Sequence, residues 1–278
     1  MKAYKIKHSI LLEHQNKFYL LEDNDWDPFI NDDDLYEKTK RLVSSITPMD
    51  NGPDLIADEL EPPVDGQEIW ASGVTYYSSK LGREEESKEA GGSDFYARVY
   101  DADRPELFFK ATKHRTVGSG GYVRIRGDST WDVPEPELTL VITSNGTIVG
   151  YTIGNDMSSR SIEGENPLYL PQAKCYDGSA AVGPCIYVTD QPLPPETTIE
   201  LSVERDNSVV YADEITIDQI KRNFTELVSY LYKECSFPCG SLLMTGTGIV
   251  PSNEFTLQHD DEISITIQPI GTLINKVR

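Results

Sequence analysis

The sequence predicts an α+β protein dominated by β-strands, with a small N-terminal domain over residues 1–65 and a larger domain over residues 66–278. From residue 68 onward, short segments rich in β-branched and aromatic residues follow one another, separated by Gly, Pro and Asn. Only one long segment, residues 218–233, repeats apolar residues at helical spacing. Prolines and glycines gather between residues 48 and 66, which indicates a connector between two domains. Many strands around one long helix argue against a doubly wound sheet.

The 278 residues carry 25 Lys and Arg against 46 Asp and Glu, which gives a formal net charge of −21. The strong negative charge repels phosphate, so we expect no nucleic-acid partner. No apolar run approaches the ~20 residues that a membrane helix needs, and the first residues lack the apolar core of a signal peptide. These features predict a cytoplasmic protein without a membrane partner. Composition leaves open whether the acidity reflects a saline habitat or a general solvated surface.

Residues 1–22 are expected to form a β-hairpin, because apolar and charged residues alternate on both sides of a polar turn. Asp33 or Asp34 then caps a short helix that carries Leu35 and Val43. We expect this small domain to serve packing rather than catalysis.

The larger domain is expected to contain strands at residues 68–73, 107–110, 122–126, 138–143, 147–153, 181–189, 198–205, 242–246 and 262–267. The charged run at residues 83–88 predicts one solvated helical face. The helix at residues 218–233 places Phe224, Leu227 and Leu231 on one apolar stripe.

Asn145-Gly146 stands between two β-rich runs and is the strongest short hairpin signal in the chain. A two-residue loop there pairs Ser144 with Thr147. Carried along both strands, this register places residue 135 opposite residue 156.

Three carboxylates meet in that register. Glu135 lies opposite Asp156 and Glu137 lies opposite Gly154, and the alternation of strand side chains puts all three acids on one face. Acids this close repel unless a cation lies among them, and oxygen ligands with open positions suit Mg²⁺ or Mn²⁺. Spacing alone leaves a second interpretation open, in which the acids spread over a solvated sheet face.

Two further groups of residues stand out. A basic run in this acidic chain predicts either an anion site or a salt-bridged dimer face, and consists of Lys110, Lys113, His114, Arg115, Arg124 and Arg126. The four cysteines lack the CxxC spacing of metal and redox sites, so we expect reduced thiols.

Four motifs in order along the chain resemble the fumarylacetoacetate hydrolase family: Pro-Glu135-Pro-Glu137-Leu, Gly-Tyr-Thr-Ile-Gly-Asn-Asp156-Met-Ser-Ser-Arg160, Lys174-Cys-Tyr-Asp-Gly and Thr-Gly-Thr247-Gly. The resemblance implies a mixed β-sandwich roll. It also implies that the three acids hold Mg²⁺, with Mn²⁺ or Ca²⁺ as alternatives. Lys174 would then stand beside the metal, and Thr247 and Arg160 would contact the substrate.

One position departs from the hydrolases of that family. They usually carry a Gly-x-Asn-Tyr-x-x-His pattern whose histidine activates the attacking water, whereas Gly73-Val-Thr-Tyr-Tyr-Ser-Ser79 ends in serine. Serine is no base near neutral pH, so we expect Ser79 only to contact substrate and we disfavour C–C bond hydrolysis. Residues 100–112, 128–131 and 163–172 resemble instead the subgroup of the family that dehydrates 2-keto-3-deoxy sugar acids.

The resemblance therefore implies a metal-dependent dehydratase of pentose oxidation, acting on a 2-oxo acid. The expected substrate is 2-dehydro-3-deoxy-D-arabinonate and the expected product is 2,5-dioxopentanoate. Lys174 is the candidate base for the C3 proton, and Glu106 or Glu163 is the candidate acid for the C4 hydroxyl; these roles can be exchanged. Because the family commonly forms dimers or tetramers, we expect a homodimer or homotetramer.

Two alternatives stay open from the sequence. The first is a hydrolase of acylpyruvates or diketo acids that uses the same metal site with another base. The second is a noncatalytic acidic protein that binds divalent ions on an exposed sheet.

Overall fold

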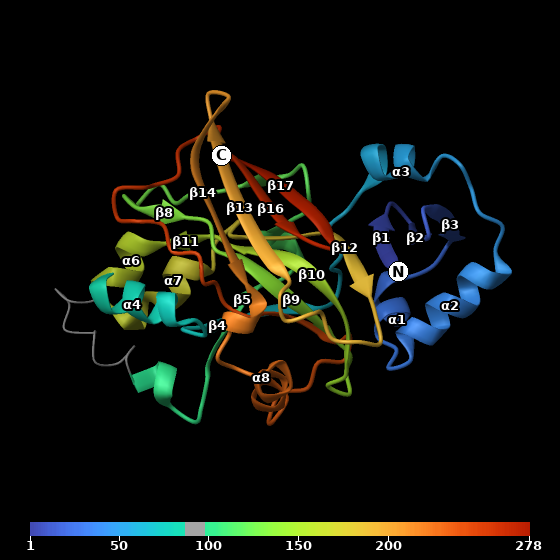
Figure 1. Ribbon diagram of the computed structural model, residues 1–278, viewed down its shortest axis with the longest axis horizontal. Helices are drawn as coiled ribbons and strands as arrows, with labels where there is room; N and C mark the ends of the chain where they lie inside the picture. Colours follow the sequence, from blue (N-terminus) through green and yellow to red (C-terminus); the bar gives the residue numbers. More distant parts are fainter. Residues whose placement is uncertain (87–97) are drawn as a thin grey trace.

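The computed structural model of the chain describes residues 1–86 and 98–278 (Figure 1). The charged segment expected at residues 83–88 is helical as far as Glu86, and its last two residues lie outside the described ones. Among the described residues, no helix is long and apolar enough to cross a lipid bilayer.

The larger of the two main sheets has ten strands. Their order is β3-β2-β1-β12-β10-β9-β15-β4-β5, with β6 paired to β12. The strands are β1 (Lys2–Ile6), β2 (Ser9–His14), β3 (Lys17–Glu22), β4 (Glu68–Gly73), β5 (Glu106–Ala111), β6 (Thr116–Val117), β9 (Pro136–Ile142), β10 (Ile148–Asp156), β12 (Ala180–Val188) and β15 (Ser241–Met244). Most pairs are antiparallel, while β15 runs parallel to β4 and β6 to β12, so the sheet is mixed.

A five-stranded sheet packs over this one, in the order β14-β13-β16-β17-β7. Its strands are β7 (Tyr122–Val123), β13 (Thr198–Arg205), β14 (Ser208–Thr216), β16 (Glu262–Ile267) and β17 (Gly271–Val277). A short pair, β8 (Asp132–Val133) and β11 (Ser158–Ser159), lies beside them. The expected β-dominated α+β fold with a sandwiched, mixed sheet is confirmed.

Helices cover the ends of the sandwich. They are α1 (Trp26–Ile30), α2 (Leu35–Ser45), α3 (Gly52–Glu59), α4 (Tyr77–Glu86), α6 (Arg160–Glu165), α7 (Leu170–Lys174) and α8 (Phe224–Leu231). Short 3₁₀ turns occur at Lys113–Arg115, Pro167–Tyr169 and Ile217–Gln219. In Figure 1, α1 to α3 gather at one end of the molecule, and α4, α6 and α7 gather at the other.

The hydrophobic core lies on both faces of the large sheet. On one face, Leu138 and Leu140 of β9 pack against Ile263 and Ile265 of the five-stranded sheet. The other face packs its own apolar side chains under the N-terminal helices, where Trp26 is buried. Because successive side chains of a strand alternate, Glu137 faces away from the five-stranded sheet.

The N-terminal segment differs from its prediction. Residues 1–22 form three strands rather than one hairpin, because His8 adopts a positive φ of 57° and turns the chain between β1 and β2. The helix expected next is present as α2, with Asp34 at its N-cap position. Since β1 pairs with β12, the N-terminal strands extend the large sheet. The division into domains at residues 65 and 66 stays a prediction.

The helix predicted at residues 218–233 is wrong in its first part. Ile220 forms a β-bridge with Tyr76, and the N–H of Lys221 donates to the carbonyl of Thr75. These backbone contacts prevent helical hydrogen bonding, so α8 begins only after Asn223, whose side chain accepts from the Thr225 N–H. The strands β14 and β17 were not predicted; most of β14 is exposed on both faces and lacks an alternating pattern.

The β9–β10 hairpin fixes the register of the predicted carboxylate face. The predicted two-residue loop is wrong: the N–H of Thr143 donates to the Thr147 carbonyl, so three residues form the loop, and Gly146 takes a φ of +80°. An irregularity between Ile148 and Gly150 then shifts the register by one residue. Beyond it, the predicted pairing of Glu137 with Gly154 is confirmed.

We predict that Gly154→Ala destabilises the protein. A Cβ at this position would lie 2.4 Å from Thr139 Oγ1 and 2.9 Å from Met244 Cε, inside a fully packed region. Such overpacking costs about 1–3 kcal/mol. Urea unfolding would measure the loss. Gly127→Ala is the matched control, because nothing lies within 4 Å of its added Cβ. Equal stability of the two variants would contradict the prediction.

Candidate active site

Three carboxylates converge at the end of the β9–β10 hairpin. Glu135, Glu137 and Asp156 are all buried, and one oxygen of each lies within 4.8 Å of the others. The hairpin sets this geometry, because the Asp156 N–H donates to the Glu135 carbonyl at 3.0 Å. The convergence expected from strand register is therefore present, and the acids lie in the protein interior rather than on a solvated sheet face.

Lysine side chains meet these acids. Lys174 ends α7, and its Nζ lies 2.6 Å from Glu135 Oε2 and 3.2 Å from Asp156 Oδ2. Lys110 of β5 is fully buried, and its Nζ lies 2.6 Å from Asp156 Oδ1. Its ammonium also donates to the carbonyls of Met157 and Lys174. Burial lowers the pKa of Lys110, and the charge of Asp156 opposes that shift.

Arg160 completes the charged cluster from the start of α6. Its Nη2 lies 3.2 Å from Glu135 Oε1, and the side chain is 3% exposed. Ser159 caps α6 by accepting from the Ile162 N–H, which places Arg160 at the first helical position. Arg160 was predicted to bind substrate, and the structure places it against the Glu135 carboxylate.

The lysine amines contact Glu135 and Asp156, so the negative charge of Glu137 is the least neutralised of the three. Its Oε2 accepts from the Gly246 N–H at 2.5 Å. Burial raises the pKa of Glu137 well above its usual value, and the charges of Asp156 and Glu135 raise it further. A divalent cation among the three acids would relieve this repulsion. All the donor atoms are carboxylate oxygens, the ligands that Mg²⁺ prefers, so the residues fit such an ion.

The loop after β15 closes one side of the cluster. Gly246 adopts a φ of +93°, and an added Cβ would meet the Thr75 hydroxyl, so only glycine brings its N–H to Glu137 here. The neighbouring Thr247 is buried, and its hydroxyl exchanges hydrogen bonds with the backbone of Ile249. The predicted substrate contact of Thr247 stays a prediction.

Ser79 lies at the start of α4. Its hydroxyl donates to the Tyr76 carbonyl at 2.8 Å and accepts from the Tyr76 N–H. Tyr76 is completely buried, and burial followed by the charge of Glu137 raises its pKa. Ser79 therefore lies three residues after Tyr76, whose ring is influenced by Glu137 of the cluster. The Ser79 hydroxyl is hydrogen-bonded to the Tyr76 backbone.

The two candidate acids occupy different surroundings. Glu163 of α6 is 2% exposed, and its Oε2 accepts from Ser158 Oγ at 3.2 Å. Glu106 is partly buried at the start of β5, opposite Gly73 of β4. A Cβ on Gly73 would overlap the Glu106 carboxylate, so the glycine makes room for it.

The residues of the predicted basic run lie in two different environments, one in the interior and one at the surface. Lys110 was grouped with surface residues, yet it is fully buried against Asp156, so that assignment is wrong. The apolar Leu-Phe-Phe before Lys110 predicted the strand but gave no signal for the burial of the lysine. Lys113 forms an ion pair with Asp65, and Arg126 one with Asp128.

A fourth buried acid, Asp132, lies in β8 opposite Ser159. It is 3% exposed, and burial raises its pKa to about 6. Burial, and after it the charge of Asp132, raises the pKa of Tyr176, which lies two residues after Lys174. Sequence analysis did not single out Asp132 as a buried acid.

The family model described as fumarylacetoacetate (FAA) hydrolase C-terminal matches residues 75–278. The chain belongs to the fumarylacetoacetate hydrolase family. Within it, the chain is 53% identical over 217 residues to a probable 2-keto-3-deoxyxylonate dehydratase of Haloferax volcanii, covering 77% of this chain and 73% of the relative. It is 43% identical over 224 residues to 2-dehydro-3-deoxy-D-arabinonate dehydratase of Saccharolobus solfataricus, covering 79% of this chain and 74% of the relative.

Solved structures agree with these relatives. The structure of 2-keto-3-deoxy-D-arabinonate dehydratase complexed with magnesium and 2,5-dioxopentanoate has a TM-score of 0.86 and 35% identity, covering 100% of this chain and 99% of that one. The apo form of the same dehydratase has a TM-score of 0.87. The family assignment expected from the four motifs is confirmed, and the similarity extends over the N-terminal strands and helices.

We predict that Asp132→Asn stabilises the protein relative to wild type as pH rises. Folding raises the pKa of this acid from 3.8 to about 6. Between those pH values the carboxyl ionises in the unfolded chain but stays protonated in the native protein, so the native state loses stability until the buried carboxyl ionises as well. The free energy of unfolding of the variant should exceed that of wild type by at most about 3 kcal/mol above pH 6. Urea unfolding from pH 4 to pH 8 measures it.

Asp128→Asn provides a control with the opposite sign. The hydrogen bond from Arg126 lowers the pKa of the exposed Asp128, so Asp128→Asn should lose stability relative to wild type as pH rises toward 3.8 and should show no further change above it; this control therefore extends the urea titration down to pH 2.5. A pH-independent difference between Asp132→Asn and wild type would show that Asp132 does not titrate in this window.

Proposed function

We propose that this member of the fumarylacetoacetate hydrolase family is a Mg²⁺-dependent dehydratase. Its substrate is a 2-keto-3-deoxy sugar acid, namely 2-dehydro-3-deoxy-D-arabinonate, and its product is 2,5-dioxopentanoate. The contact of the Lys174 amine with two of the three clustered carboxylates carries the proposal, because it sets a proton-transferring group beside a divalent-metal site. The dehydratases to which the chain is similar support the substrate class.

Glu135, Glu137 and Asp156 would hold the metal. When bound, Mg²⁺ would stabilise the negative charge that develops on the 2-oxo acid group as the C3 proton leaves. The Gly246 N–H keeps Glu137 oriented for this task, and Arg160 does the same for Glu135. Burial of all three acids excludes competing water and strengthens their electrostatic interactions.

Lys174 is the proposed base for the C3 proton. The two buried lysines differ in the number of acceptors that surround their ammonium groups. Lys110 meets three acceptors, namely Asp156 Oδ1 and the carbonyls of Met157 and Lys174, which match the three hydrogens of an ammonium group. Lys174 meets two carboxylate oxygens. Lys110 therefore acts as a fixed cation that positions Lys174, and Lys174 exchanges the proton.

Glu106 or Glu163 is proposed to protonate the departing C4 hydroxyl. Elimination then yields a 2-oxo acid with a C3=C4 double bond. Transfer of a proton from C5 to C3 converts it into a C4=C5 enol, which tautomerises to the aldehyde, so that water is the only other product. Ser79 is proposed to contact the substrate without acting as a base, because its hydroxyl is engaged by the Tyr76 backbone. This engagement disfavours C–C bond hydrolysis, which requires activation of an attacking water at that position.

We further propose that the enzyme works in the cytoplasm as a homodimer or homotetramer, with Mn²⁺ or Ca²⁺ as possible substitutes for Mg²⁺. All four cysteines are free thiols, which supports a reducing compartment. Tyr122 and Ile274 expose large apolar side chains on the neighbouring strands β7 and β17, which supports contact with a second copy.

We predict rapid turnover of 2-dehydro-3-deoxy-D-arabinonate by the purified chain with Mg²⁺. An NAD(P)-dependent aldehyde dehydrogenase that consumes 2,5-dioxopentanoate reports the product. EDTA should abolish the signal and added Mg²⁺ should restore it. Glu137→Gln should lose Mg²⁺ binding in calorimetry together with about 10³-fold of kcat/KM. Glu204→Gln, on the exposed side of β13, should leave both unchanged.

Two outcomes would contradict this function. A metal-loaded, folded protein without turnover excludes the substrate, and cleavage of an acylpyruvate into two carboxylic acids identifies a hydrolase. An active Glu137→Gln variant that still binds Mg²⁺ excludes the proposed ligand set.

We predict that Glu106→Gln and Glu163→Gln separate the acid from a bystander. The residue that protonates the C4 hydroxyl should lose about 10²–10⁴-fold in kcat when its proton is removed, because the amide cannot donate in the same way. The other variant should change mainly KM. Steady-state kinetics with the coupled assay distinguishes the two. Wild-type kcat in both variants would rule out both residues.

A further inference from the structure

A basic pocket lies beside the end of β17. Its cavity volume is about 670 Å³, and the lining residues are Arg124, Ile125, Arg126, Gly127, Ser129, His259 and Arg278. Three of these side chains are arginines and none is acidic. In a chain with a net charge of −21, such a concentration of positive charge needs a specific cause.

The pocket is built from three separate segments that the backbone holds in place. The N–H of Arg278 donates to the Val123 carbonyl at 2.8 Å, which joins the residue after β17 to the end of β7. The N–H of Asp260 donates to the Val277 carbonyl at 2.9 Å, which fixes the turn that carries His259. The basic side chains therefore come from three segments that are hydrogen-bonded to the sheet, and not from one loop.

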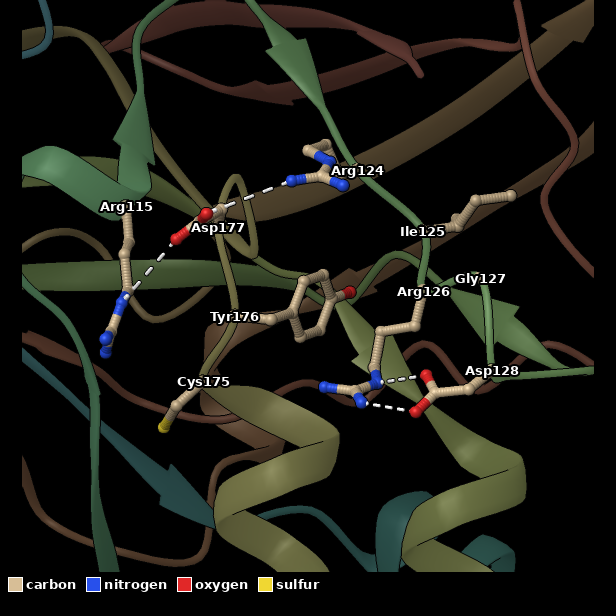
Figure 2. Close-up of a pocket in the computed structure, with 9 residues that line it drawn as sticks. All are labelled: Arg115, Arg124, Ile125, Arg126, Gly127, Asp128, Cys175, Tyr176 and Asp177. Carbon is tan, nitrogen blue, oxygen red and sulfur yellow. Dashed lines mark hydrogen bonds and ion pairs between the residues drawn. The ribbon is translucent and has the colours of Figure 1, made fainter.

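The arginines are only partly neutralised by neighbouring acids. Arg126 is held by both oxygens of Asp128, at 2.7 and 2.6 Å. Arg124 lies 4.0 Å from Asp177, an acid that is also 3.8 Å from Arg115. Figure 2 shows these pairs around an adjoining pocket of about 360 Å³, where Arg115, Arg124 and Arg126 surround the ring of Tyr176. Positive charge therefore remains in excess on this face.

We propose that this pocket, lined by Arg124, Arg126, His259 and Arg278, binds a small anion with several negative charges. Guanidinium groups donate paired N–H bonds to carboxylate and phosphate oxygens, so polycarboxylates and phosphate esters share the chemistry that would be recognised. A single negative charge would leave the arginines incompletely neutralised. None of the three clustered carboxylates lines this pocket, and its binding does not depend on the proposed dehydratase activity.

The position of the pocket links it to the cluster. Nη1 of Arg126 donates to the Gln172 carbonyl at 3.0 Å, and Gln172 lies in α7, which ends at Lys174. An acidic segment of a second copy would present similar charges, but the convergence of basic side chains from three segments on one pocket favours a small ligand. A second copy as the occupant is a distinct outcome of the test.

Calorimetric titration of the full-length, Mg²⁺-loaded protein at low salt tests the proposal. Inorganic phosphate and tricarballylate, a tricarboxylate without a 2-oxo group, serve as probes for the two anion classes. We expect saturable binding of at least one probe, and the tighter probe identifies the class. Arg124→Ala/Arg278→Ala should weaken it about tenfold or more.

The matched control is Lys40→Ala/Arg41→Ala, which removes the same charge from the exposed surface of α2. It should bind like wild type, and circular dichroism should confirm that both double variants fold. Equal affinity of wild type and the pocket variant, or no saturable binding of either probe, would overturn the proposal. So would loss of the oligomer in Arg124→Ala/Arg278→Ala by sedimentation, which would assign the pocket to a second copy.

Discussion

A row of alternating buried charges is the constraint on which the rest of the structure depends. Lys110, Asp156, Lys174, Glu135 and Arg160 follow one another at contacts of 2.6 to 3.2 Å. Removing one member would leave an uncompensated charge in the interior, which typically costs about 3–5 kcal/mol. The row draws its members from β5, α6, α7 and the β9–β10 hairpin. The same contacts that balance charge thus hold the helices α6 and α7 against the large sheet.

The hairpin shows how local irregularity supports a precise site. Three loop residues and the shift between Ile148 and Gly150 cancel each other, so that Glu137 lies opposite Gly154 and Asp156 follows Glu135. A one-residue slip would turn the acids toward the core, since strand side chains alternate. The absence of a side chain at Gly154 leaves space that Thr139 and Met244 fill. The register of the β9–β10 hairpin, the irregularity between Ile148 and Gly150, and the glycine at position 154 therefore depend on one another.

Sequence reasoning found the parts whose signals are local. Strands with alternating apolar residues, the carboxylate face and the family motifs could be predicted, because each depends on residues close in the chain. The extent of α8 could not, because the bridge between Ile220 and Tyr76 joins distant segments. Neither could the role of Lys110, which lies 46 positions before its partner Asp156. Burial of a lysine depends on what the fold places beside it, and no local pattern records that.

The charge of the cluster explains how an acidic protein can serve an anionic substrate. In formal charges, Lys110, Lys174 and Arg160 set three positive groups against the three clustered carboxylates, and a divalent cation would add two further positive charges. Salt screens exposed charges over about 8 Å at physiological ionic strength, whereas buried charges are screened much less. The surface charge of the chain therefore weighs little at the site, where the local positive charge acts on the substrate carboxylate. A protein this acidic can bind an organic acid if its buried cations, rather than its surface charge, face the acid, as they would at the proposed metal site.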